Sequence, residues 1–183
     1  MTKGGADMSV EEVPSDRFPY LLHPCRAVLV TCGVEKPNII AIAWIMPVSR
    51  DPPLLALAVS PKRYSHKLIV EGGEFVVNVP PFELKEEVLF CGRKSGRDVD
   101  KFEASGLTKE PSKEVRVPRI KECIAFMECK LEMVVPAGDH DIFIGRVLHA
   151  CARKGLLAKS GVWDLDEVRP LLHLGRDKFV TTV

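Results

Sequence analysis

The feature that most constrains the fold is an alternation of apolar and polar residues late in the chain. Between residues 123 and 133 the odd positions are all apolar, and Glu128, Lys130 and Glu132 fall between them. A period of two places successive side chains on opposite faces of a β-strand. The turn "PAGDHD" follows, and "IFIGRVLHACA" provides a returning strand. Residues 123–152 are therefore predicted to form an antiparallel hairpin.

The rest of the chain contains more strand patterns than helix patterns. The run 39–49 is almost continuously apolar, so we expect one strand that is covered on both sides or lies inside a barrel. Strands outnumber helices and do not alternate regularly with them, which favours a mainly β fold, an antiparallel barrel with added helices. The other predicted strands lie at 26–33, 54–60, 74–79 and near 171–175. Helical spacing predicts short helices at 64–71, 82–92 and 99–107, and residues 107–122 are expected to be irregular.

Length and charge limit the organisation and the partners. A chain of 183 residues is predicted to form a single domain over residues 21–183, preceded by a flexible or covering segment at 1–20. The net charge is +1 and the basic residues are dispersed, so we expect no nucleic-acid partner. No apolar stretch approaches the roughly 18 residues of a membrane span, and the first residues contain no signal-like apolar core. These patterns predict a cytoplasmic protein without membrane contact.

The six cysteines form no C-x-x-C pair, and several interrupt apolar runs. Close pairs of ligands are typical of zinc sites, so no metal is expected, and the cysteines are predicted to be buried, reduced thiols. Rossmann, P-loop, G-x-S-x-G and H-E-x-x-H signatures are all missing. The segment "GRKSGRD" at 92–98 is only superficially similar to a phosphate loop.

The stretch "SPKRYSHKLI" at 60–69 is the strongest candidate site. If Pro61 ends a strand, the residues that follow it lie at the N-terminus of a helix, where free N–H groups and the helix dipole attract anions. Arg63 can hold phosphate oxygens through paired hydrogen bonds, and Lys62 adds a point charge. The alternative is a solvated helix start with Ser65 as its cap. The cluster predicts a phosphate site, with that alternative open.

Six segments occur in a familiar order: the pattern N-x5-W-x-x-P-V-S-x-D-P-P-L-L from Asn38, then "SPKRYSHKLI", "GGEFVVNV", "SGRDVDKFEASGL", "ECKL" and "HDIFIGRV". Over residues 20–175 the chain resembles the flavin reductase-like, FMN-binding split-barrel family, and within it the flavoredoxin-type branch. The resemblance implies an antiparallel split β-barrel of Greek-key type that forms a homodimer, with FMN in a groove near the dimer interface.

The resemblance also implies positions for the cofactor. The phosphate is expected at the turn formed by Ser60, Lys62, Arg63, Tyr64 and Ser65. The flavin ring is expected along Trp44, Ile45, Met46, Pro47 and Val48. Lys101 is placed to balance negative charge on the phosphate or the reduced ring. His140, the catalytic candidate, is expected near the flavin or an incoming nicotinamide.

Each of these residues has a structural alternative. Trp44 fits a buried core position, His140 an exposed turn, and Lys101 a solvated helix face. Relatives often have Thr or Ser near the position of Met46, so this side chain does not offer the same hydrogen bond. Asp139, His140 and Asp141 are too close in sequence to converge readily on a metal ion.

The resemblance implies an oxidoreductase in which FMN accepts a hydride from NAD(P)H, a transient donor, and passes electrons to a flavin, a ferric complex or a redox protein partner. A second possibility is an electron carrier without enzymatic activity, whose FMN is reduced by a protein. A third is a non-redox binding module of similar fold.

Overall fold

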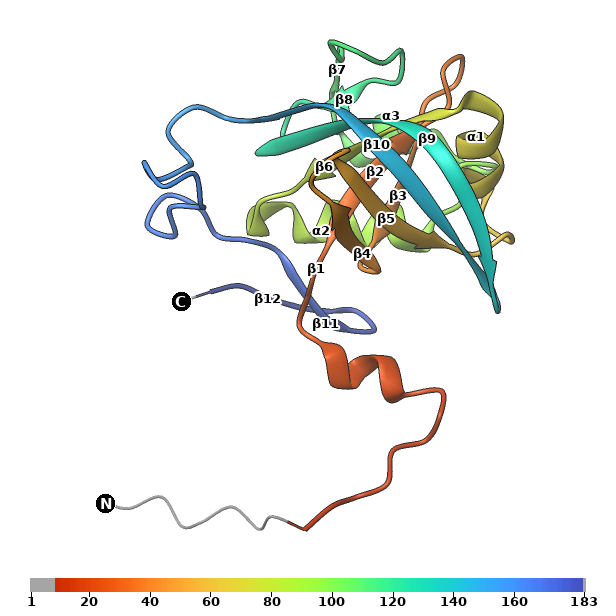
Figure 1. Ribbon diagram of the computed structural model, residues 1–183, viewed down its shortest axis with the longest axis vertical. Coiled ribbons are helices and arrows are strands. Elements are labelled where there is room, and N and C mark those ends of the chain that lie inside the picture. The colour runs from red at the N-terminus through yellow and green to blue at the C-terminus, as the bar shows by residue number, and fades with distance from the viewer. Residues whose placement is uncertain (1–8, 183) are drawn as a thin grey trace.

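The computed structural model describes residues 9–182, which form a curled antiparallel sheet surrounded by short helices (Figure 1). The sheet is built from β2 (Val28–Cys32), β3 (Asn38–Ile42), β4 (Ile45–Ser49), β5 (Leu54–Val59), β6 (Glu74–Val79), β9 (Ala125–Ala137) and β10 (His140–Ala152). Its strand order is β3-β2-β6-β9-β10-β5-β4. The prediction of a mainly β fold with added helices is confirmed.

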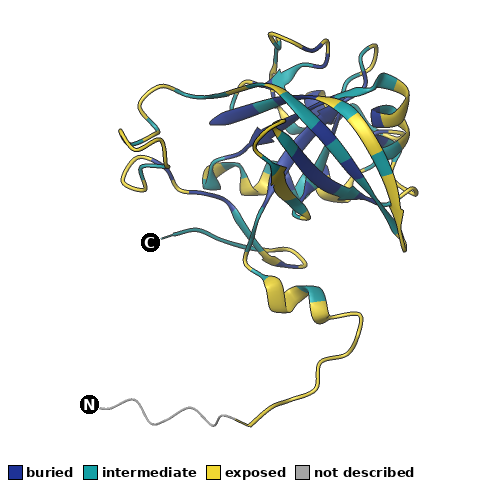
Figure 2. Cartoon of the chain, viewed as in Figure 1, coloured by how far each residue is buried: buried dark blue, intermediate teal, exposed yellow. Residues whose placement is uncertain are grey.

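The predicted hairpin at 123–152 is present as β9 and β10. The two strands pair from His140 opposite Ala137 to Ala152 opposite Ala125, with two register shifts along the way. Such irregularities bend a strand and increase its twist, which helps the sheet to curl. The first half of β9 is buried and the half near the turn is exposed (Figure 2).

The prediction of a single strand at 39–49, covered on both sides or inside a barrel, is wrong. The chain breaks at Ala43 and Trp44, so that β3 pairs with β2 whereas β4 pairs with β5. Strand β4 is the edge strand, and Met46 on it is 57% exposed. A continuous apolar run does not distinguish a covered strand from an edge strand with an exposed apolar face.

The three predicted helices are present as α1 (Tyr64–Gly72), α2 (Lys85–Arg93) and α3 (Lys101–Ser105), with a 3-10 turn, η2 (Phe82–Leu84), before α2. Helices α2 and α3 contact β3, and their apolar side chains join Leu29, Ile39 and Phe126 in one core cluster. No helix within residues 9–182 has both the length and the apolar character that a membrane crossing requires.

A strand from the N-terminal part of the described chain pairs with two strands from its C-terminal part. A small sheet has the order β1-β11-β12 and contains β1 (Cys25–Arg26), β11 (Leu172–Gly175) and β12 (Lys178–Val180). The predicted final strand is therefore confirmed. A 3-10 turn, η1 (Phe18–Leu22), precedes β1, and the chain before it extends away from the barrel (Figure 1). Of the predicted covering segment 1–20, residues 1–8 lie outside the described residues.

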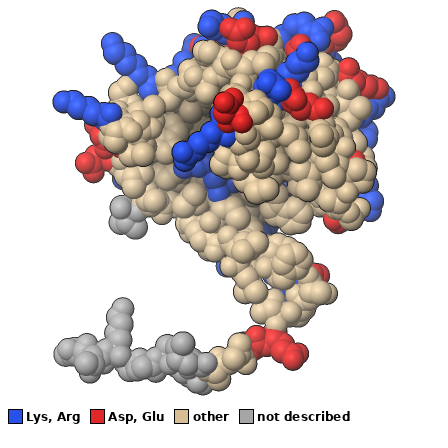
Figure 3. Space-filling view, in the orientation of Figure 1, with Lys and Arg blue, Asp and Glu red and all other residues tan. Residues whose placement is uncertain are grey.

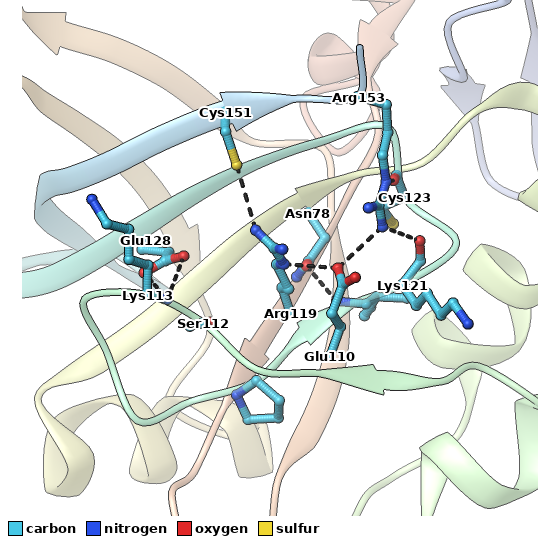
Figure 4. A network of polar contacts seen from close by, with 12 residues as sticks. Asn78, Glu110, Ser112, Lys113, Arg119, Lys121, Cys123, Glu128, Cys151 and Arg153 are labelled. Carbon is cyan, nitrogen blue, oxygen red and sulfur yellow. Dashed lines mark hydrogen bonds and ion pairs between the residues drawn. The ribbon is translucent and has the colours of Figure 1, made fainter.

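Segment 107–122 has two short strands, β7 (Lys109–Glu110) and β8 (Arg119–Ile120), and is otherwise irregular, as expected. The carboxylate of Glu110 accepts hydrogen bonds from Arg119 Nε (2.8 Å) and Arg153 Nη2 (3.1 Å), as Figure 4 shows. Both guanidinium groups lie against the ring of Phe126. Burial alone would raise the pKa of Glu110, but the Arg153 hydrogen bond and the two positive charges lower it. We term this trio the paired network.

Candidate functional site

The turn between β5 and α1 carries two exposed basic side chains, Lys62 and Arg63. Arg63 is the N-cap of α1 and has an extended backbone, and no side chain caps the helix. Neither Lys62 nor Arg63 has a side-chain ion pair with any residue in 9–182. The alternative in which Ser65 caps the helix is wrong, because Ser65 is buried and its Oγ accepts a hydrogen bond from Asn38 Nδ2 at 2.8 Å.

These residues border a cavity of about 190 Å³, which we term the cationic cradle. It combines the helix start with the end of α2, the following loop and the first residue of α3. No Asp or Glu is among its lining residues. The polar side chains that line it are those of Asn38, Lys62, Arg63, Tyr64, Ser65, Arg93, Lys94, Ser95, Arg97 and Lys101. Four of the five residues predicted for the phosphate therefore lie in one cavity.

Lys101 is a buried cation rather than a solvated one. It is 4% exposed, and its Nζ donates to the carbonyl oxygens of Ile39 (2.6 Å) and Cys91 (2.7 Å). Burial lowers the pKa of Lys101, and the positive charge of Arg63 lowers it further. An ammonium group has three N–H donors, so one remains for an anion in the cradle. The alternative of a solvated helix lysine is wrong.

Sequence reasoning missed Asn38 and the loop 92–98 as parts of the cradle. Arg97 stacks over the ring of Tyr64, with 5.3 Å between the guanidinium carbon and the ring centroid. A Cβ at Gly96 would lie 2.0 Å from Asn38 Oδ1, so this close approach requires glycine. The fold brings the glycine and the cations of this loop to the predicted phosphate turn.

A second cavity, of about 450 Å³, adjoins the cradle, and Arg63 lines both. We term it the aromatic chamber, because the rings of Tyr20, Trp44 and three histidines line it. Ser60, the fifth residue predicted for the phosphate, lies here. Trp44 is 45% exposed, so its alternative as a buried core residue is wrong. The volume is within the range of small-molecule sites.

His140 stands beside Trp44 in the aromatic chamber, with 4.8 Å between the two ring centroids. Its Nδ1 is 2.8 Å from Asp139 Oδ1, and this hydrogen bond lowers the pKa of Asp139. The carboxylate accepts from Nδ1, which leaves Nε2 for a ligand. Asp141 binds His66 Nε2 at 2.7 Å and so ties the hairpin turn to α1. His140 is half-buried rather than freely exposed.

The five residues predicted for the flavin ring do not lie together. Trp44 lines the aromatic chamber, and Trp44, Ile45 and Met46 line a separate apolar groove of about 410 Å³. Pro47 and Val48 line neither. Ala58 N donates a hydrogen bond to Trp44 O at 3.0 Å. Hydrogen-bonded and non-hydrogen-bonded pairs alternate along an antiparallel ladder, so the next pair, Ile45 and Leu57, is not hydrogen-bonded. The N–H and C=O groups of Ile45 therefore point away from β5, to the unpaired edge of β4. The roles of Ile45, Met46, Pro47 and Val48 stay predictions.

A curled antiparallel half-barrel of this kind is shared with solved FMN-binding split-barrel proteins, which confirms the predicted fold. The chain belongs to the flavin reductase-like family, because the model of the flavin reductase like domain matches residues 22–181. A protein of Archaeoglobus fulgidus is 47% identical over 161 residues, which is 88% of this chain and 89% of that protein.

Two solved structures illustrate the likeness. The FMN-binding protein from Thermus thermophilus with bound 1-cyclohex-2-enone is 30% identical, with 96% of this chain and 95% of that chain covered and a TM-score of 0.83. Flavoredoxin from Methanosarcina acetivorans is 28% identical, with coverage of 96% and 92% and a TM-score of 0.82. These relatives support flavin binding and an oxidoreductase activity in general.

Proposed function

We propose that this protein binds FMN and acts as an oxidoreductase that takes electrons from NADH or NADPH and delivers them to a flavin, a ferric complex or a redox protein. One observation carries the proposal: the cationic cradle and the aromatic chamber adjoin at Arg63. A molecule with an anionic tail and a flat ring fits such a pair of cavities.

The cradle suits a phosphate by charge. Neither Lys62 nor Arg63 forms an ion pair within residues 9–182, although the charge of Lys62 contributes to the lowered pKa of Asp139. Lys101 supplies a desolvated cation with an unused donor. Charge-assisted hydrogen bonds of this kind are the strongest that side chains make. The cradle residues therefore bind the tail and fix the position of the whole cofactor.

A ribityl chain suits the floor of the cradle. The Oδ1 of Asn38 is buried and has no hydrogen-bond partner in the described structure. A buried acceptor without a donor is costly, and a ligand hydroxyl group can satisfy it. FMN has such hydroxyls between its phosphate and its ring, so the residues present fit the cofactor in chemistry and in order.

The aromatic chamber suits the ring. When bound there, FMN would supply the hydride acceptor that no protein side chain provides. Trp44 offers a stacking surface, and His140 Nε2 can hold a proton next to the bound ring. No dinucleotide motif is present in the sequence, so NAD(P)H is proposed to bind transiently.

We also propose that the protein is a homodimer and that it is cytoplasmic. Exposed apolar side chains on β4 and η1, including Met46, Phe18 and Leu22, line the apolar groove. Burial of such a face against a second copy would remove it from water. Sedimentation equilibrium of the FMN-loaded protein should give the mass of two chains. A single-chain mass at micromolar concentration would contradict the dimer.

An absorption spectrum of the purified protein, repeated during FMN titration, tests cofactor binding. Anaerobic mixing of the FMN-loaded protein with NADH or NADPH should then bleach the flavin absorbance rapidly. If FMN binds but neither nucleotide bleaches it, the electron-carrier alternative replaces the enzyme. If FMN does not bind, both are wrong, and a non-redox binding module remains.

A further inference from the structure

The two ends of the chain build one wall of the aromatic chamber, which we term the terminal wall. It consists of Tyr20, His23, His173 and Arg176. Tyr20 and His23 belong to η1 and the residue after it, and His173 and Arg176 belong to β11 and the turn that follows. The ligand that we assign to this wall rests on the proposed function.

The two histidines of the terminal wall are fixed by backbone carbonyls. His23 Nδ1 donates to His173 O at 2.9 Å, and His173 Nε2 donates to Arg176 O at 2.8 Å. Carbonyl oxygens only accept hydrogen bonds, so these two ring nitrogens must carry protons. The rings contact each other edge to face, with 5.0 Å between their centroids. His173 Nδ1 is buried and finds no partner in the part of the chain that the structure describes.

Arg176 adopts a backbone conformation that side chains rarely tolerate. Its φ is 52°, the only positive φ of a non-glycine residue within 9–182. On one side is Gly175, where a Cβ would lie 2.9 Å from the ring of Tyr20. On the other side, Asp177 forms an ion pair with Arg93 of α2. The surroundings therefore hold a strained arginine at the chamber, and such strain is typical of functional sites.

The guanidinium of Arg176 has no carboxylate partner among residues 9–182, although it is next to Asp177. Among residues 9–182, the chamber is lined by Arg63 and Arg176 and by one acid, Asp16, which is exposed. Arg63 also lines the cradle, where the phosphate is proposed to bind. Arg176 is then the cation that remains for a second ligand.

We propose that the terminal wall binds the carboxylate of a planar, conjugated organic acid, which is a further substrate that receives electrons in the chamber. Arg176 holds the carboxylate through paired N–H···O hydrogen bonds, the geometry that guanidinium groups favour. The rings of Tyr20 and Trp44 select a flat body. A ligand hydroxyl group can donate to His173 Nδ1, which would satisfy that buried atom.

The test uses the full-length protein loaded with FMN and follows the flavin absorbance during titration with benzoate. Benzamide, which has nearly the same shape but no charge, is the matched ligand. Arg176→Asn removes the guanidinium and keeps a residue type that tolerates a positive φ. Lys178→Asn removes a positive charge from the same hairpin outside the chamber, and Arg176→Lys restores the charge at the site itself.

We expect benzoate to bind more tightly than benzamide, and Arg176→Asn to weaken benzoate roughly tenfold or more. Arg176→Lys should recover part of that loss, and Lys178→Asn should change the affinity by less than about twofold. FMN affinity should be the same in all variants. Equal binding of benzoate by the wild type and Arg176→Asn would overturn the inference, and so would a complete failure of benzoate to bind.

Two further outcomes separate this inference from the proposed function. If Arg176→Asn weakens the binding of FMN, or weakens the binding of NADH but not of benzoate, Arg176 belongs to a nucleotide site. The inference of a carboxylate site is then wrong, and the proposal of FMN binding stands. If the wild-type protein does not bind FMN, the proposed function is wrong, and the inference that rests on it is overturned with it.

Discussion

Two clusters of basic side chains in this protein differ in their counter-charges. In the paired network, Arg119 and Arg153 share the carboxylate of Glu110 (Figure 4). Both guanidinium groups also lie over the ring of Phe126. In the cationic cradle, no acid lines the cavity, and one of the cations, Lys101, is buried. Elsewhere, on the face shown in Figure 3, basic and acidic side chains are interspersed over the barrel.

This difference in counter-charge leads us to expect that the paired network stabilises the fold and that the cationic cradle binds an anion. A buried cation is costly unless an anion compensates it. The paired network carries its own anion, and it joins β7 and β8 to the residue that follows β10. No acid among residues 9–182 lines the cradle, and the buried ammonium of Lys101 is compensated by two carbonyl oxygens alone, so we expect a bound anion to lower the electrostatic cost. The two clusters should therefore respond in opposite ways when their charges are removed.

The largest expected effect is the loss of FMN from the cradle. Replacement of both Lys62 and Arg63 by Ala should weaken FMN binding by on the order of 2–4 kcal/mol, because charge-assisted hydrogen bonds to the phosphate are lost. This corresponds to a roughly 30- to 1,000-fold higher Kd in a flavin fluorescence titration. Without FMN, the unfolding midpoint should be unchanged or slightly higher.

The matched control replaces Lys67 and Lys154, two exposed lysines outside both cavities, by Ala. It removes the same net charge and should leave FMN affinity nearly unchanged. If the two double variants lose FMN affinity to the same extent, the cradle has no special role and only net charge matters.

Lys101→Met should weaken FMN binding about tenfold or more, because a charged donor to the phosphate is removed. Burial lowers the pKa of Lys101, so the wild-type ammonium loses its proton at a lower pH than an ordinary lysine. Wild-type FMN affinity should therefore fall as pH rises through that lowered pKa. Titrations from about pH 7 to pH 10 should show this fall in the wild type and not in Lys101→Met. If FMN affinity changes with pH in the same way in the wild type and in Lys101→Met, the role assigned to the Lys101 ammonium is wrong.

Glu110→Gln should affect stability and not cofactor binding. The folded state lowers the pKa of Glu110, so its stabilising contribution is present above the unfolded pKa and is lost as pH falls through the folded pKa. After allowance for solvent screening, we expect a loss of about 1–2 kcal/mol at pH 7 in urea unfolding, and a smaller loss at about pH 3. Glu86→Gln, at an exposed position on α2, is the control. A pH-independent loss would mean that the charge of Glu110 is not the cause.

The smallest expected effect is spectroscopic. The chain has two tryptophans, Trp44 in the aromatic chamber and Trp163 outside it. FMN should quench the emission of Trp44, so Trp44→Phe should abolish most of the quenching while Trp163→Phe retains it. If quenching persists in Trp44→Phe, the flavin ring is not beside this residue.

The parts of the fold and site that could be predicted are those whose pattern is local. The hairpin of β9 and β10 follows from apolar and polar residues that alternate with a period of two. The predicted phosphate site needs a strand end and a helix start, and both lie within six residues, 60–65. The break between β3 and β4 was missed because an apolar run has the same composition on an edge strand as on a covered one.

The residues that were missed come from distant segments. Asn38, Gly96 and Arg97 reach the cradle only because β3, α2 and α3 pack together. Nothing in the neighbourhood of Lys101 indicates that its Nζ reaches the carbonyls of Ile39 and Cys91. Arg176 reaches the chamber through the pairing of β1 with β11, which long-range contacts decide.

A crystal structure of the protein with FMN tests the central claim most directly. The account predicts the phosphate within hydrogen-bond distance of Arg63 in the cationic cradle, near Gly96 and Lys101, and the flavin ring in the aromatic chamber against Trp44. A phosphate in solvent, with the ring in the apolar groove beneath Met46 or elsewhere, would contradict it.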